Sequence, residues 1–270
     1  MKLIRASSIF PCLPDKIHTQ HELKDDTPRR QNSMTDKRII QSPNKLARMT
    51  GILYILVILL GVANEIIVRN FIFIPGDITT TVNHITAYES IFRFGFVISL
   101  TRFAVFILLV LALYKMFGSV DKDCSLIMIA FALVSIAIGM VSLLFQYAAP
   151  LLLSSSGYST LFTTDQWHAQ VLFFINMQLM GDKASQILTV WLLPLGYLIY
   201  KSGFLPKILG VLMLIAGLGY MTDFLVFFLL PNLDWQVAGF AFLGELPFPL
   251  WLLLKGVNVE QWRGRTLEEA

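Results

Sequence analysis

Long apolar segments alternate with short polar breaks along most of this chain, and six of the segments are candidates for membrane spans. Roughly 20 apolar residues in a helix cross a hydrocarbon core about 30 Å thick. Because backbone groups inside a bilayer need hydrogen-bond partners within the protein, the pattern predicts helices. We expect an all-α fold, a polytopic membrane helical bundle with about six transmembrane helices. The expected spans are residues 46–68, 91–114, 125–148, 184–200, 207–230 and 237–255.

The segment before the fourth expected span mixes apolar and polar side chains from Gln166 to Met180. This mixture suits a helix at the membrane interface or packed into the mouth of the bundle. The fourth span is short, and Pro194 predicts a kink in it. A single tilted helix over residues 171–200 is the alternative. In the sixth span, Pro247 and Pro249 remove backbone donors and predict a bend or a break.

The N-terminal segment is polar and basic, and residues 15–44 contain no aromatic side chain. Such a segment buries too little apolar surface to offset the entropy of ordering, so we expect residues 1–44 to be disordered. Pro11 and Pro14 interrupt it before an apolar stretch develops, which is unlike a signal peptide. Residues 1–33 add no recognisable fold, so Met34 is an alternative start. The expected division is then this segment, a membrane domain over 45–258 and a cytoplasmic tail over 259–270.

Lysine and arginine fall on alternate breaks, which sets the expected orientation. The N-terminal segment, the breaks after the second and fourth spans and the C-terminal tail are basic, whereas the other three loops carry only Arg69 and Lys183. Basic loops stay on the cytoplasmic side. We therefore expect a multi-pass protein of a cell inner membrane with both termini in the cytoplasm. Loops 69–90, 149–183 and 231–236 are expected to face outside.

The composition limits the other classes of function. Of the 270 residues 56% are hydrophobic and 14% are charged. The net charge of +3 does not indicate a nucleic-acid partner, because 10 of the 21 basic residues lie at or before Arg48, where they favour cytoplasmic retention. The expected partners are the lipid bilayer and an unidentified small molecule or membrane protein. Cys12 and Cys124 are both expected on the cytoplasmic side, where they would remain thiols.

Four stretches of this sequence carry a family resemblance: Ala47 to Glu65, Ile74 to Gly95, Tyr197 to Tyr220 and Gly244 to Asn258. Together they resemble the bacterial membrane family called domain of unknown function 4386. The similarity extends over residues 45–258, and SGFLPKILG and LWLLLKGVN are its most specific parts. The resemblance implies a bacterial inner-membrane protein of about six helices. It brings no established activity to this chain.

Three ionisable residues lie inside the expected spans without a partner on their own helix. Arg102 is near the centre of the second span and Glu245 near the centre of the sixth, and Asp223 lies slightly outward from the middle of the fifth. A central arginine or aspartate costs at least about 2.5 kcal/mol on insertion scales. We therefore expect Arg102 to point into the bundle and to pair with Glu245, with Asp223 close to both. This buried charge group is a candidate binding or proton site.

Other charged residues have simpler explanations. Two pairs at the outer ends have i,i+4 spacing and can close locally, namely Glu65 with Arg69 and Glu89 with Arg93. His84 and His168 lie near carboxylates in the sequence, but their spacing matches no metal-ligand motif, so we expect neither a metal nor a cofactor. The spans contain no catalytic constellation, so an enzyme is not favoured and no catalytic residue is assigned.

The preferred function from the sequence is a binding, sensing or accessory component of the membrane. The first alternative is a small proton-coupled transporter, since one arginine against two carboxylates favours proton uptake or coupled titration. It would use Arg102, Asp223 and Glu245. The second alternative is a membrane enzyme with an outer-face site. A purely structural ion pair also accounts for the three charges, because charges inside membranes often pair with one another.

Overall fold

The computed structural model describes residues 42–74, 76–154, 162–230, 232–233 and 237–268, and every regular element in these ranges is a helix. Four helical stretches in them are long and apolar enough to cross a membrane: Pro43–Ile67, Glu89–Phe117, Lys122–Leu152 and Lys207–Leu229. The bent pair Ala238–Leu254 and Val259–Arg265 makes a fifth if it is counted as one span. The all-α membrane fold is therefore confirmed, whereas the number of six spans is not.

Several sequence predictions concern residues outside the described ranges. They are the disorder of residues 1–41, the alternative start at Met34, the thiol of Cys12 and the loop around Ser155. The first described helix begins at Pro43, two residues before the expected start of the membrane domain.

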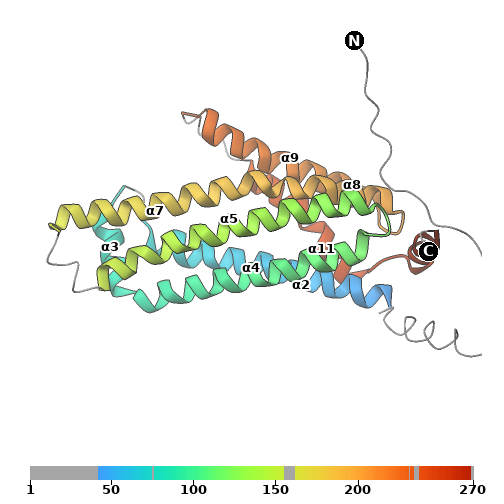
Figure 1. The fold of residues 1–270 in the computed structure, drawn as a ribbon, viewed down its shortest axis with the longest axis horizontal. Helices are drawn as coiled ribbons and strands as arrows, with labels where there is room; N and C mark the ends of the chain where they lie inside the picture. The colour runs from blue at the N-terminus through green and yellow to red at the C-terminus, as the bar shows by residue number, and fades with distance from the viewer. Residues whose placement is uncertain (1–41, 75, 155–161, 231, 234–236, 269–270) are drawn as a thin grey trace, which may run out of the picture. The chain divides into compact units, whose positions relative to one another are not determined.

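The bundle is built from α2 (Pro43–Asn64) and its π-helical continuation η2 (Glu65–Ile72), α4 (Glu89–Phe117), α5 (Lys122–Ser154), α7 (Thr164–Gln186), α8 (Leu192–Ser202) and α9 (Lys207–Leu229). The short helices are α3 (Ile78–Ala87), the 3₁₀ segment η3 (Ile187–Trp191), α10 (Ala238–Glu245), α11 (Pro247–Leu254) and α12 (Val259–Glu268). Helices α2, α4, α5 and α7 lie side by side in this order (Figure 1). Helix α2 also packs on α11, and α8 packs on α9.

The helix boundaries follow from local sequence signals. The Ser42 hydroxyl accepts a hydrogen bond from the backbone nitrogen of Lys45 at 3.3 Å, and Pro43 occupies the first helical position of α2. Helix α8 ends at Gly203, whose φ of 78° is open to glycine, and Pro206 directly precedes α9. The tight turn predicted between these two helices is therefore confirmed.

The expected start of a span at residue 184 is wrong. Helical conformation continues without interruption from Thr164 through α7, η3 and α8 to Ser202. The alternative of one helix over 171–200 is closer, because glutamines and asparagines lower hydropathy but leave helical hydrogen bonding intact. Pro194 acts on its N-terminal side, since its ring displaces the carbonyl four residues earlier, at Val190 in η3.

The expected outer loop over residues 69–90 contains two further helical segments. The π-helix η2 extends to Ile72, and α3 follows after a turn. Asp77 caps α3, because its carboxylate accepts hydrogen bonds from the Thr80 backbone nitrogen at 2.9 Å and from the Thr80 hydroxyl at 2.6 Å. These bonds hold the pKa of Asp77 below its ordinary value. The sequence contains this capping signal, but α3 is too short and too polar to form a long apolar run.

Small residues allow two helix pairs to approach closely. A Cβ at Gly51 of α2 would lie 3.0 Å from both the Pro249 carbonyl oxygen and the Leu253 nitrogen of α11. Gly196 of α8 and Gly210 of α9 face one another in the same way. Such contacts are typical of membrane helices, where packing replaces the hydrophobic effect as the source of association.

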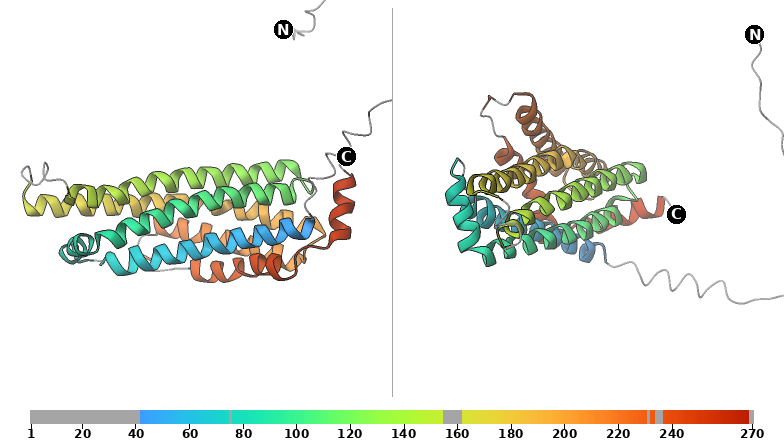
Figure 2. Two further views of the ribbon diagram at one scale, coloured as in Figure 1. Left: turned by 90° about the horizontal axis from the view of Figure 1, so that it is seen from below. Right: turned by 60° about the vertical axis from the view of Figure 1, so that its left-hand side comes forward.

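The expected cytoplasmic tail includes α12, which turns by 99° from the α10–α11 segment and lies across the ends of the bundle helices (Figure 2). Trp262 of α12 is buried, and its ring centroid lies 4.6 Å from that of Phe204 in the turn between α8 and α9. The helix is thus packed on the membrane domain. We refer to the two ends of the bundle as the α3 end and the α12 end.

Candidate functional site

The three charges expected to form one group have separate partners in the structure. Glu245 is the last residue of α10, directly before the break that leads to α11. Its carboxylate accepts a hydrogen bond from the Tyr54 hydroxyl of α2 at 2.6 Å and one from the Tyr220 hydroxyl of α9 at 3.0 Å. The Tyr54 side chain is 1% exposed. Glu245 therefore ties three helices together through two tyrosines.

Asp223 of α9 is buried and forms the N-terminal cap of α10. Its two carboxylate oxygens accept hydrogen bonds from the backbone nitrogens of Val237 and Ala238, both at 2.6 Å. A carboxylate at this position also interacts favourably with the positive end of the helix dipole. These two hydrogen bonds fix the connection between α9 and α10.

Arg102 of α4 lies against α2 instead of α10. A Cβ at Gly61 would lie 3.6 Å from Cδ of Arg102, and the guanidinium carbon is 4.7 Å from the ring centroid of Phe103. Among the described residues, the carboxylates whose charge acts on Arg102 are Asp182 of α7 and Glu65 of η2. Arg102 is therefore embedded between α2, α4 and α7.

The predicted pairing of Arg102 with Glu245 is corrected by these contacts. Glu245 contacts Tyr54 and Arg102 faces Gly61, seven residues further along α2. Seven residues correspond to about 10 Å at 1.5 Å per residue. The two charges therefore lie at different depths. Glu245 lies near the middle of the segment Ala238–Leu254, as expected, but its level on α2 is that of Tyr54 instead of Gly61.

Four buried polar atoms without a hydrogen-bond partner gather near Arg102. They are Asn64 Oδ1, Ser99 Oγ, Arg102 Nε and Gln146 Nε2. We call these four residues the polar layer. In the described part of the chain, one other buried side-chain atom has no partner, Ser125 Oγ at the α12 end.

Packing places the polar layer within a short range of depth. Helices α2 and α4 run in opposite directions, so Asn64, three residues after Gly61, lies level with Ser99, three residues before Arg102. The ring centroids of Phe96 and Tyr147 are 5.1 Å apart, which brings the neighbouring Gln146 within about one turn of Ser99. The layer therefore spans about 8 Å along the bundle.

Polar contacts continue from the layer towards α7. The amide nitrogen of Gln178 donates to Gln146 Oε1 at 3.3 Å, and the Ser135 hydroxyl donates to the Ser185 carbonyl oxygen at 3.1 Å. Ser142, also buried on α5, donates to the carbonyl oxygen of Ile138. The interface between α5 and α7 is thus unusually polar for a bundle interior. Gln146 in a span without charges was the sequence signal that an account based on charges overlooked.

The predicted outer-end pairs are partly described. Glu89 and Arg93 form an ion pair at 2.6 Å. Glu65 lies in η2, and the side chain of Arg69 is outside the described residues.

His84 Nδ1 lies 3.1 Å from the carbonyl oxygen of Phe71, and its ring packs on that of Tyr88. No group of three or more histidine, cysteine or acidic side chains in the described ranges is arranged to hold a metal ion.

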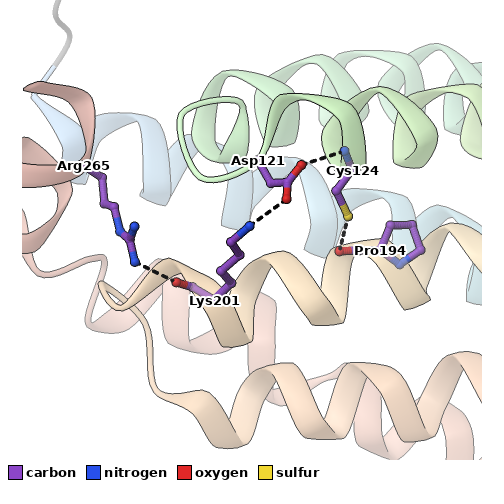
Figure 3. Close-up of polar contacts among 5 residues, drawn as sticks. All are labelled: Asp121, Cys124, Pro194, Lys201 and Arg265. Carbon is purple, nitrogen blue, oxygen red and sulfur yellow. Dashed lines mark hydrogen bonds and ion pairs between the residues drawn. The ribbon is translucent and has the colours of Figure 1, made fainter. Parts of the chain in front are cut away.

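A second polar cluster fixes the α12 end (Figure 3). The Lys201 ammonium lies 2.7 Å from the Asp121 carboxylate, which also accepts a hydrogen bond from the backbone nitrogen of Cys124 at 3.1 Å. The Cys124 thiol donates to the carbonyl oxygen of Pro194, and Arg265 of α12 donates to that of Lys201. The hydrogen bond to Lys201 lowers the pKa of Asp121 and raises that of Lys201. This cluster joins the α4–α5 turn to α8 and α12.

Comparisons with known proteins agree with the expected range of the resemblance. The model of the family described as domain of unknown function 4386 matches residues 49–256. An uncharacterized protein of Archaeoglobus fulgidus is 29% identical over 152 residues, which cover 56% of this chain and 76% of that protein. No solved structure matches. The description of the family assigns no activity.

Proposed function

We propose, for a chain that belongs to the membrane family of domain of unknown function 4386, that its bundle binds a small polar solute at the polar layer. The observation that carries this proposal is the gathering of four unpaired buried atoms within about 8 Å along the bundle. Each unsatisfied buried polar group costs about 1–3 kcal/mol. Four of them, from α2, α4 and α5, therefore favour occupation of the layer by water or by a ligand.

The types of these atoms indicate the chemistry of the ligand. Arg102 Nε and Gln146 Nε2 are donors, Asn64 Oδ1 is an acceptor, and the hydroxyl of Ser99 can act as either. A matching solute has both donor and acceptor groups. The charge of Arg102 is countered by Glu65 and Asp182, so the site offers no surplus positive charge to an anion. These features favour a small neutral or zwitterionic solute.

Access from the α3 end suits this site. Ser99 lies ten residues along α4 from Glu89, which corresponds to about 15 Å. The π-helix η2 begins directly after Asn64. Segments of this kind occur frequently at functional sites, because the wider turn displaces backbone groups from regular pairing. The distribution of basic residues supports an orientation in an inner membrane with the α3 end outside and both termini inside.

Cysteine labelling tests the proposal. In a chain with Cys12 and Cys124 replaced by serine, Ser99→Cys is compared with Leu100→Cys, its neighbour on the outer surface of the bundle, where Leu100 is 37% exposed. A sulfonated methanethiosulfonate, which does not cross membranes and reacts with thiolates, is added to intact cells. Thr79→Cys, exposed in α3, serves as the positive control for the α3 end.

The proposal requires that the cysteine at position 99 react, whereas the lipid-facing cysteine at position 100 does not. Equal lack of reaction at both positions, with reaction at position 79, would show a dry interior and refute the proposal. If the cysteine at position 79 reacts only after the cells are opened, the α3 end faces the cytoplasm and the proposed orientation is wrong.

A further inference from the structure

A groove of about 470 Å³ lies at the α12 end, on the opposite end of the bundle from the proposed solute access. Its lining includes Phe204, Pro206, Trp251, Lys255, Asn258 and Gln261. A volume of this size is within the range of small-molecule sites, about 300–1,000 Å³. The two most specific stretches of the family resemblance, SGFLPKILG and LWLLLKGVN, meet here.

The groove is held in shape by contacts between segments that are far apart in the sequence. The backbone nitrogen of Asn258 donates to the carbonyl oxygen of Phe204 at 3.1 Å, and that of Val257 donates to Asn44 Oδ1 at 3.0 Å. Gly256 adopts a φ of 72°, which allows the chain to turn from α11 towards α12. The walls are thus preformed.

The chemistry of the lining combines a cation with an aromatic ring. The Lys255 ammonium lies 5.7 Å from the ring centroid of Trp251, and Lys255 is in none of the salt bridges that the described residues form. The lining contains no carboxylate. The backbone nitrogens of Glu260 and Gln261 donate to Asn258 Oδ1, so the N-terminus of α12 is already capped. Lys255, the side-chain amides of Asn258 and Gln261 and the indole of Trp251 are the side-chain donors of the lining.

The surroundings of the groove are those of a membrane interface. Next to Trp251 and Lys255 on α11, Leu250 is 45% exposed and Leu254 is 74% exposed. Tryptophan and lysine next to exposed leucines are typical of the boundary between headgroups and acyl chains. A ligand at this point can place an anionic group on Lys255 and an apolar chain along α11.

We propose that this groove binds the headgroup of an anionic phospholipid, with the phosphate at Lys255 and an acyl chain along Leu250 and Leu254. The charge of the lining selects the anion, and the exposed apolar face of α11 selects a lipid over a soluble phosphate. Anionic lipids gather in the cytoplasmic leaflet, and a nearby lysine strengthens binding to them. The site is independent of the polar layer.

The test uses the purified full chain in mixed micelles, and native mass spectrometry counts bound phosphatidylglycerol against phosphatidylcholine. We expect a preference for phosphatidylglycerol of about fivefold, the effect of one lysine at an anionic surface. Lys255→Gln should abolish this preference and Lys255→Arg should retain it. Lys207→Gln is the matched control, because its ammonium also lies over an aromatic ring, at 5.3 Å from the centroid of Tyr200, outside the groove.

Three outcomes would overturn the proposal. Equal losses for Lys255→Gln and Lys207→Gln would indicate general surface attraction. Binding without any preference between the two lipids would exclude selection by charge. Displacement of phosphatidylglycerol by millimolar inorganic phosphate would identify a soluble ligand instead of a lipid.

Discussion

The hydrogen bond from Tyr54 to Glu245 should be among the most costly in the bundle to remove. Its oxygen atoms are 2.6 Å apart, and Tyr54 is almost completely buried. A hydrogen bond to a charged group contributes about 1.5–3 kcal/mol, compared with about 0.5–1.5 kcal/mol for neutral partners. We therefore expect Tyr54→Phe to lower the free energy of unfolding by about 0.5–3 kcal/mol, a range that covers a neutral and a charged Glu245. Tyr220→Phe should cost less, because its distance is 3.0 Å and its side chain is partly exposed.

The same substitution should have a different effect when the carboxylate is absent. In a Glu245→Leu background, the Tyr54 hydroxyl is left buried without its partner, which by itself costs about 1–3 kcal/mol. Tyr54→Phe should then be neutral or stabilising. The free energies are measured by titration of the purified chain with sodium dodecyl sulfate, with circular dichroism as the signal. Tyr200→Phe, on the surface of α8, controls for the loss of a hydroxyl.

Equal costs of Tyr54→Phe in the two backgrounds would refute this reasoning. The two residues would then act independently, and the short contact would contribute nothing specific. A coupling of 0.5 kcal/mol or more between contacting residues is the usual lower limit for a real interaction.

Three further predictions follow from the contacts. Arg102→Leu and Glu245→Leu should be additive within about 0.5 kcal/mol in the same unfolding assay, because the two charges have separate partners. Gly51→Ala should cost about 1–3 kcal/mol, since its Cβ would press on the α11 backbone. Asp121→Asn should lower the melting temperature across neutral pH. As the pKa of Asp121 is lowered, its stabilising effect is present above the ordinary aspartate pKa near 4 and is lost as the pH falls through the folded-state value.

Each of these predictions has a control or a limit. A coupling free energy well above 0.5 kcal/mol between Arg102→Leu and Glu245→Leu would contradict the separate partners of the two charges. Gly239→Ala in α10 is the control for Gly51, because a Cβ there meets no atom within 4 Å and alanine favours a helix. For Asp121, the pKa of Lys201 is raised, so the contribution of the pair should also persist up to the ordinary lysine pKa near 10 and be lost as the pH rises through the folded-state value. A difference between variant and parent that is constant at every pH would contradict the assignment.

The apolar pattern predicted most of the bundle because lipid exposure imposes hydrophobicity over whole helices. Helices α2, α4, α5 and α9 begin and end within a few residues of the expected spans, except that α5 extends to Ser154. The same criterion failed for α7, where Gln178 donates to Gln146 of α5 and where Gln166 and Asn176 are exposed. It also missed α3, which is short and is defined by the cap at Asp77. High hydropathy identifies helices that face lipid, and it does not identify helices that contain many polar residues.

The sequence predicted which charged residues are buried at the candidate site, but it did not predict which partners they bind. Depth identified Arg102, Asp223 and Glu245 as buried or partly buried groups that need partners. Their actual partners are two tyrosine hydroxyls, two backbone nitrogens and carboxylates on other helices. Which face of each helix turns inward, and how far Glu245 lies from the break at Pro247, depends on packing. These distances cannot be read from the pattern of apolar and charged residues.

The contact between Gly51 and α11 joins the first helix of the described bundle to one of the last, which has a consequence for biosynthesis. Leu253 follows Gly51 by about 200 residues, and ribosomes add about 5–20 residues per second, so roughly 10–40 s separate the two helices. During this interval Tyr54 has no carboxylate to bind, and the notch at Gly51 faces lipid or a helper protein. The bundle can close only when its C-terminal helices reach the membrane, so the earliest helix receives its final neighbours last.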